Sequence, residues 1–234
     1  MRKILLVSLL LGFIGPVSGC AEEPGVSEEA DMGVEISLPD PEVRGRVSVE
    51  EAINNRHSVR SFSRRALELE DVSQVLWAAG GMRVDAVSAA SRSYPSAGGA
   101  YPLEFYLVAG NVEGLDPGIY LYDASGHSLS GHREGDLRGD LASAALGQGF
   151  VGAAPATIVI TADYARSTGR YGDRGVRYVY MDAGHSGENI YLACVARGLG
   201  TVAVGAFRDD QANGVINPPG DEEVIYIFPI GHPE

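Results

Sequence analysis

A dense group of hydrogen-bond donors lies in residues 56–63, which read RHSVRSFS. Phosphate groups in proteins are held by arginine forks, hydroxyls and free backbone N–H groups. The side chains that could supply such contacts are Arg56, His57, Ser58 and Arg60. Val59 and Phe62 can point inward and fix the segment to a core. The composition alone is equally consistent with a solvated loop, since most charged loop residues face water.

A second candidate is the polar, glycine-rich stretch SYPSAGGAYP at residues 93–102. Its small side chains would let the backbone come close to a flat ring, and its serine offers a hydroxyl. The residues in question are Pro95, Ser96, Ala97 and Gly98. The stretch is neither a Walker loop nor a dinucleotide-binding GxGxxG motif. Alone, it could also be a flexible surface loop.

A third candidate is Gly205-Ala206, at the end of the apolar run TVAVGAF, although a tight turn explains this pair equally well.

The sequence does not support a zinc site or a serine hydrolase. The four histidines considered as zinc ligands are His127, His132, His185 and His232, and their spacing to carboxylates does not fit such a site. We expect His185 to be a core histidine. The segment HSGEN does not match the GxSxG of serine hydrolases.

The N-terminus reads as an export signal. Arg2 and Lys3 precede the apolar run 4–15, which is too short to span a bilayer comfortably. The following VSGC resembles the lipobox of lipoproteins. It predicts a signal peptide over 1–19, lipidation of Cys20, and an exported protein anchored to a membrane at its periplasmic or extracytoplasmic face. An ordinary signal peptide with a chance cysteine is the alternative.

Composition narrows the function further. The formal net charge is −13, and the sequence contains no basic stripe, so we expect no nucleic-acid partner. Lys3 is the only lysine, which leaves the body without an amine for Schiff-base chemistry. The acidic, proline-containing residues 20–47 read as a disordered or extended tether. Cys194 lies in an apolar helical stretch and is predicted to pack in the core.

The folded body is predicted to begin at residue 48. Ser48 and Glu51 form a capping box for a helix over about 49–56, and apolar spacing predicts a second helix from 69, stopped by Gly80-Gly81. The remaining predicted helices are a short one near 137–146 and a long, largely buried one over 174–198. The predicted strands are 103–109, a hairpin over 118–134, 156–164, 201–207 and 222–231. This pattern indicates an α+β domain with a sheet of about five strands.

In order, RHSVR, PSAGGAYPLEFYLV, RYVYMDAGHSGENIYLACVARGLGTVAVGAF and IFPIGHP resemble the nitroreductase family of FMN flavoproteins. The PSxGGxYP and AGHxxxN patterns are most similar to its SagB/ThcOx-type dehydrogenase branch. The resemblance covers 48–234. It implies an α+β sandwich with a central, mainly antiparallel sheet, and an intertwined homodimer with FMN at the interface. It also implies an FMN-dependent oxidoreductase that transfers hydride through flavin N5.

The resemblance also implies roles for individual residues. Arg56, His57 and Ser58 would meet the phosphate and ribityl chain, and Arg60 the ribityl or pyrimidine edge. Pro95, Ser96, Ala97 and Gly98 would line the isoalloxazine, while Gly205 and Ala206 would bring backbone near N5. His232 stands in a GxP position where an arginine often binds the phosphate. No side chain is expected to act as a catalytic acid or base.

Two features leave the substrate open between a small molecule and a peptide. Azoline-oxidising members of the branch are associated with a Lys–Tyr pair, whereas the comparable helix here reads Arg177-Tyr178. An exported location also offers little NAD(P)H, so the electron donor could be a substrate, a quinol or another redox protein. The alternatives are a flavin-binding lipoprotein without turnover and a peptide dehydrogenase.

Overall fold

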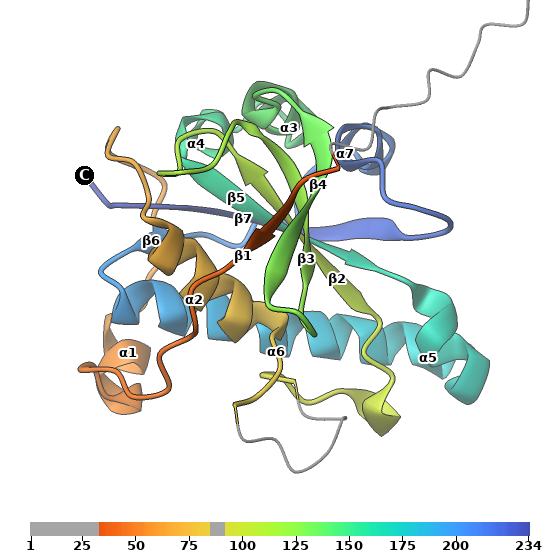
Figure 1. The fold of residues 1–234 in the computed structure, drawn as a ribbon. Helices are drawn as coiled ribbons and strands as arrows, with labels where there is room; N and C mark the ends of the chain where they lie inside the picture. Colours follow the sequence, from red (N-terminus) through yellow and green to blue (C-terminus); the bar gives the residue numbers. More distant parts are fainter. Residues whose placement is uncertain (1–32, 85–91) are drawn as a thin grey trace, which may run out of the picture.

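The computed structural model describes residues 33–84 and 92–234. The predicted signal peptide, Cys20 and the first part of the predicted tether lie outside these residues. Within them the chain forms an α+β sandwich (Figure 1), as the sequence predicts. The sheet has the strand order β1-β4-β3-β2-β5-β7-β6, and all its paired strands are antiparallel. It therefore has seven strands in the described chain, instead of about five.

The centre of the sheet consists of β2 (Leu103–Ala109), β5 (Ala156–Ala162) and β7 (Glu223–Gly231). Every residue of β5 is buried, as expected for an apolar strand covered on both faces. The hairpin of β3 (Gly118–Asp123) and β4 (Ser128–Glu134) extends one side of this centre. The predicted strand over 201–207 shrinks to β6 (Gly200–Thr201).

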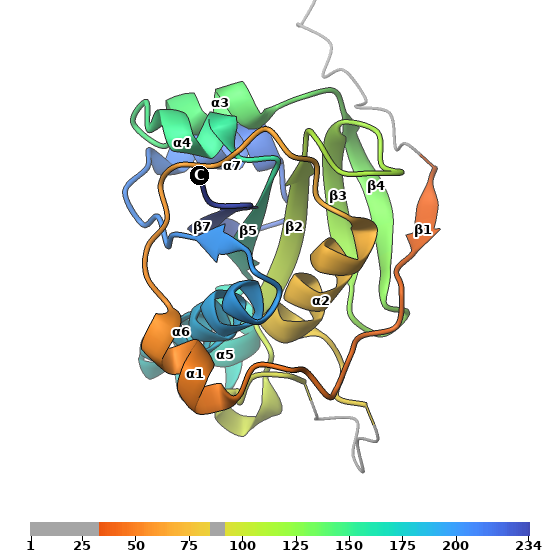
Figure 2. The ribbon, with the colours of Figure 1, turned by 90° about the vertical axis from the view of Figure 1, so that its left-hand side faces the viewer.

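Two helical layers cover the two faces of the sheet (Figures 1 and 2). One face packs against α2 (Leu69–Gly80) and α6 (Arg174–Ala196). The other packs against α3 (Arg138–Ala144), α4 (Gly149–Ala153) and α7 (Asp209–Ile216). The remaining helices are α1 (Val49–Asn55) and α5 (Tyr164–Tyr171). The sequence predicted α1, α2, α3 and α6, but not α4, α5 or α7.

The long helix α6 is correctly placed, but the prediction that it is largely buried is wrong for the single chain. Its buried residues follow one stripe that includes Val179, Ala183 and Ile190. Gly187 lets this stripe approach the sheet, because a Cβ there would lie 2.8 Å from Cζ of Phe228. The opposite face is exposed. It carries His185, so the expectation of a core histidine is also wrong.

Residues 33–47 pack on the body, and we call them the strap. β1 (Glu35–Ser37) adds an edge strand beside β4, and the Leu38 side chain is buried in the core. Beyond it, Ser73 Oγ donates to the Pro39 carbonyl at 2.6 Å. The ordered body therefore begins well before residue 48. Ser48 follows the strap, and its Oγ accepts the Glu51 N–H at 3.1 Å and caps α1 as predicted.

Candidate functional site

The RHSVR segment leaves the end of α1 and runs beside the short strand β6. Val59 N–H donates to the Thr201 carbonyl at 2.9 Å, and Ser58 forms a parallel bridge with the same residue. The side chains of Val59 and Phe62 are buried, as the sequence predicts. The apolar residues thus fix the segment that carries Arg56, His57, Ser58 and Arg60.

Arg56, the residue that ends α1, is half-buried. Its guanidinium carbon lies 5.1 Å from the centre of the Tyr191 ring, within cation–π range. Its Nε is buried and has no hydrogen-bond partner within residues 33–84 and 92–234. A buried donor without an acceptor is costly, so an anion here would satisfy a group that the described chain leaves unpaired.

His232 shows the same feature at the end of β7. Its backbone carbonyl accepts the Ser63 N–H at 2.9 Å, which joins the C-terminus to the end of the RHSVRSFS stretch. Its Nε2 is buried and is also without a partner among the described residues. We call Arg56, Ser58 and His232 the donor cluster. Each side chain can donate a hydrogen bond, and all three belong to segments that meet β6 or β7.

The side chains of His57 and Arg60, the other two predicted site residues of the RHSVR segment, make fewer contacts with the rest of the chain. His57 and Arg60 are exposed, and His57 Nδ1 lies 3.0 Å from the Asn55 carbonyl. Arg60 has its side chain in solvent, where it is available to a ligand but is not positioned by the fold.

The strand-end loop 203–206 lies close to the RHSVR segment. Ala203 N–H donates to the Tyr191 hydroxyl at 2.8 Å, and the same hydroxyl lies 3.1 Å from Ser58 Oγ. Gly205 and Ala206 are exposed, and the Ala206 carbonyl accepts from Gln148 at 3.0 Å. The Tyr191 contact also explains the short β6, because Ala203 N–H bonds a side chain instead of a neighbouring strand.

Residues 95–99, which we call the glycine loop, contact α6 near Asp182 and not near Tyr191. Ser96 Oγ donates to Asp182 of α6 at 2.5 Å and accepts the Tyr101 N–H at 2.9 Å. Burial raises the pKa of Asp182, and the hydrogen bonds from Ser96 and the Ala97 N–H oppose this rise. Gly98 has φ +61°, and a Cβ there would collide with the Tyr171 hydroxyl. Its glycine is therefore needed for packing within this chain.

The donor cluster and the glycine loop are not side by side in one chain. Tyr191 anchors the first and Asp182 the second, nine residues apart on α6. At 1.5 Å and 100° per residue, this corresponds to about 13 Å along the helix and about half a turn around it. Figure 1 accordingly shows the end of α1 and the loop around residue 98 toward opposite ends of α6. Pro95 and Gly98 are exposed there.

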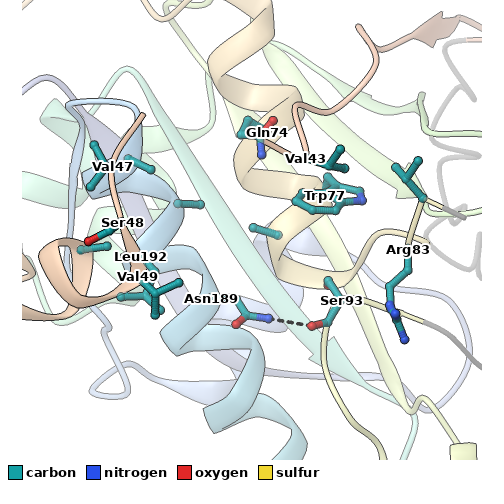
Figure 3. Close-up of a pocket in the computed structure, with 15 residues that line it drawn as sticks. Val43, Val47, Ser48, Val49, Gln74, Trp77, Arg83, Ser93, Asn189 and Leu192 are labelled. Carbon is teal, nitrogen blue, oxygen red and sulfur yellow. Dashed lines mark hydrogen bonds between the residues drawn. The ribbon is translucent and has the colours of Figure 1, made fainter. Parts of the chain in front are cut away.

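A groove of about 500 Å³ lies between the strap, α1, α2 and α6 (Figure 3). Trp77 and Leu192 give it apolar walls, and Asn189 Nδ2 donates to the Ser93 carbonyl at 3.1 Å. None of the eleven predicted flavin-site residues is among the residues that line it. We therefore locate the candidate site by the donor cluster, whose unpaired groups call for a ligand.

Sequence reasoning missed Tyr191 and Asp182. Each is a polar group within an apolar helical pattern, and this could have marked them as residues with a specific partner.

In the described ranges, no three histidine, cysteine or carboxylate side chains are grouped to hold a metal ion. The helices of the described chain include none that is long and apolar enough to cross a membrane. Cys194 is buried, and burial raises the pKa of its thiol, in agreement with a core role.

The chain matches known proteins over most of its length. A curated Methanocaldococcus jannaschii protein described as a nitroreductase is 38% identical over 198 residues, which are 85% of this chain and 96% of that protein. The trifolitoxin operon protein TfxC of Rhizobium leguminosarum bv. trifolii is 26% identical over 225 residues, or 89% of this chain and 62% of TfxC.

A solved structure and a family model point to the same family as these two relatives. The crystal structure of a protein from Ralstonia eutropha JMP134, described as a nitroreductase, is 30% identical. It superimposes with a TM-score of 0.73 over 94% of this chain and 98% of that chain. The model of the nitroreductase family matches residues 53–232, a range that contains all eleven predicted site positions. This chain belongs to the nitroreductase family.

Proposed function

We propose that the protein is an FMN-dependent oxidoreductase in which the donor cluster binds the flavin phosphate. The observation that carries this proposal is the pair of buried, unpaired nitrogens, Arg56 Nε and His232 Nε2, in the described chain. Six buried hydroxyls of the described chain also lack a partner, but these two are its unpaired nitrogens, and a buried donor calls for an acceptor. The phosphate of FMN is an acceptor of the right charge, and membership of the nitroreductase family supports the choice of ligand.

The flavin, when bound, supplies hydride chemistry at N5, and the protein supplies binding and orientation. Arg56 and Ser58 would donate to the phosphate oxygens. His232 donates more weakly than an arginine unless it is protonated. Gly205 and Ala206 carry no large side chains, so the strand-end loop leaves room for a ring and offers backbone groups to it. Among the described residues we assign none as a catalytic acid or base.

We infer that the working form is a homodimer. The donor cluster and the glycine loop lie on opposite sides of α6, so a two-fold partner would bring one loop to the other cluster. Large apolar side chains are exposed along the helices that would meet. On α1 they are Val49 and Ile53, and on α6 they are Tyr180 and Met181. Exposed apolar residues grouped in this way are typical of an interface.

We propose further that the protein is exported and anchored by a lipid on Cys20, as the N-terminal sequence predicts. Full-length protein should fractionate with membranes, and Cys20→Ser should move it to the soluble fraction with its fold intact. The control is Cys194→Ser, which leaves the lipobox unchanged and should stay with the membrane. Membrane association of both variants at the wild-type level would contradict lipidation.

Peptide oxidation is the second candidate function. It is favoured by the similarity to TfxC, whose name places it in a toxin operon, and by the resemblance to the SagB/ThcOx-type branch. Against it stands the pair Arg177-Tyr178 in place of a Lys–Tyr pair. Arg177 is exposed, and the Tyr178 ring packs edge-on against Tyr171 at 5.0 Å. An arginine cannot readily take up or release a proton.

One experiment separates these functions. The full-length protein, purified in detergent, should be yellow or should become yellow with added FMN. After photoreduction it should pass electrons to quinones or nitroaromatics. A colourless protein that ignores FMN would overturn the proposal. FMN binding without electron transfer to any acceptor would identify a flavin-binding lipoprotein, and oxidation of an azoline peptide would identify the peptide dehydrogenase.

A further inference from the structure

Tyr191 joins two segments of the proposed site, the RHSVR segment on the phosphate side and the strand-end loop. Its hydroxyl oxygen lies 2.8 Å from the Ala203 nitrogen and 3.1 Å from Ser58 Oγ. Its ring lies edge-on to the fully buried Phe228, with centroids 6.2 Å apart, so the side chain is held from within the core. Tyr191 is thus a fixed point between the RHSVR segment and the strand-end loop.

One assignment of the protons along this chain of groups gives every donor an acceptor or a ligand. The Ala203 N–H can only donate, so the Tyr191 oxygen accepts from it. The phenol proton is then available to Ser58 Oγ. If Ser58 accepts this proton, its own hydroxyl proton is free to point outward, to a ligand. The opposite direction would leave the Tyr191 proton without an acceptor in the described network.

The ring of Tyr191 acts on the second donor. The Arg56 guanidinium lies over it at 5.1 Å, an arrangement that holds the planar group and restricts its rotamers. Arginine otherwise loses considerable side-chain entropy when it is ordered by a ligand. A guanidinium already placed on a rigid ring loses less, and therefore binds an anion more tightly.

We propose that Tyr191 is a positioning residue that makes the site selective for a phosphorylated flavin. It would orient the Ser58 hydroxyl through its own hydroxyl and the Arg56 guanidinium through its ring, without touching the ligand. This inference rests on the proposed function, since it concerns the same site. It predicts that Tyr191 contributes to the binding of FMN but not to the binding of riboflavin, which has no phosphate.

The test is Tyr191→Phe, which keeps the ring below Arg56 and removes only the hydroxyl. Dissociation constants for FMN and for riboflavin are measured by quenching of flavin fluorescence on the full-length protein in detergent. FMN affinity should fall about three- to tenfold, the range of one net hydrogen bond. Riboflavin affinity should change less than about twofold, so the FMN-to-riboflavin selectivity falls.

A double-mutant cycle with Ser58→Ala shows whether Tyr191 acts through Ser58. If it does, Tyr191→Phe should have little further effect on FMN binding in the Ser58→Ala background. The matched control is Tyr120→Phe. Tyr120 is more deeply buried than Tyr191, and its variant loses one hydrogen bond, from the hydroxyl to the Asp116 carbonyl at 2.8 Å. It should leave the selectivity unchanged.

The outcomes are distinct. Equal losses for FMN and riboflavin, or additive effects in the cycle, would overturn the positioning role and leave a purely structural one. Unchanged FMN affinity in Tyr191→Phe would overturn it as well. A wild-type protein that binds neither flavin would instead refute the proposed function itself, before any variant is compared.

Discussion

Among the residues of the donor cluster, Arg56 should contribute most to anion binding because its charge is permanent and it is half-buried. Arg56→Ala is expected to weaken FMN binding by about 1.5–3 kcal/mol, the scale of a charge-assisted hydrogen bond. The measurement is a fluorescence titration. Arg65→Ala is the control, because Arg65 is exposed and paired with Glu68 at 3.4 Å. Equal affinities of Arg56→Ala and the wild type would contradict the assignment.

Residue types alone could identify the donor cluster only in part. The sequence suffices to select Arg56, Ser58 and His232, because a familiar motif carries them. It does not reveal that Arg56 Nε and His232 Nε2 are buried without partners, which depends on how β6 and β7 meet the RHSVR segment. It also does not reveal that the small size of Gly98 makes room for Tyr171 and Arg170 of its own chain. Contacts between distant segments are the information that a pattern lacks.

At the scale of elements, the contact between the glycine loop and α6 should depend on pH. Burial raises the pKa of Asp182 in the folded state, so its ionised form costs stability, and this cost appears as pH rises above the unfolded value. The Ser96 hydroxyl reduces the cost by donating to the carboxylate. Ser96→Ala should therefore destabilise the protein by about 1–3 kcal/mol at neutral pH and by less near about pH 4.

Urea unfolding at the two pH values measures this difference. Ser143→Ala is a suitable control, because the Ser143 hydroxyl donates to the Gly139 backbone carbonyl within α3 and not to a carboxylate. Its small effect should be the same at both pH values. A loss in Ser96→Ala that does not vary with pH would mean that the Ser96–Asp182 contact carries no charge-dependent stability.

The strap is the element that sequence reasoning misjudged most clearly. Its acidic, proline-containing composition indicates a tether, but Leu38 is only 7% exposed. Leu38→Ala should lower the free energy of unfolding by about 2 kcal/mol, at the lower end for a buried leucine because the site is near the sheet edge. Val43→Ala, on a strap residue that is 58% exposed, should change it by less than about 0.5 kcal/mol. Equal unfolding midpoints for Leu38→Ala and the wild type would restore the tether reading.

Elements with strong periodicity were predictable and the others were not. The bounds of β2 and the end of α2 match the sequence reading, because apolar runs and a Gly-Gly stop define them locally. α5 has the sequence YARSTGRY, without an apolar stripe, and β1 exists because β4 offers an edge. The sequence predicts a largely buried α6 because the face that is exposed in the single chain also carries large side chains such as Tyr180 and Met181.

At the scale of the whole molecule, the position of α6 between the donor cluster and the glycine loop is the reason for proposing a dimer. The donor cluster uses the Tyr191 side of the helix, and the glycine loop uses the Asp182 side, about half a turn away. A flavin that contacts both would therefore lie between two protomers. This arrangement can be tested by combining one variant from each half-site in a single dimer.

The two variants are Arg56→Ala, which damages the donor cluster, and Pro95→Glu, which places a charge on the exposed glycine loop where the ring is expected. Each homodimer should bind FMN poorly. In a heterodimer with a shared site, one site combines both damaged segments, and the other combines the two intact ones. Co-expression with two different tags and tandem purification isolates this heterodimer.

Such heterodimers should bind about one FMN per dimer with near wild-type affinity, because two-fold symmetry gives two equivalent sites and one of them is intact. If each site were built within one chain, every site would contain one damaged segment, and the heterodimer would bind as poorly as its parents. The wild-type protein with the same two tags, which should bind about two FMN per dimer, calibrates the measurement. The number of FMN molecules bound per dimer, measured by absorbance, thus decides whether each site takes its donor cluster and its glycine loop from two chains or from one.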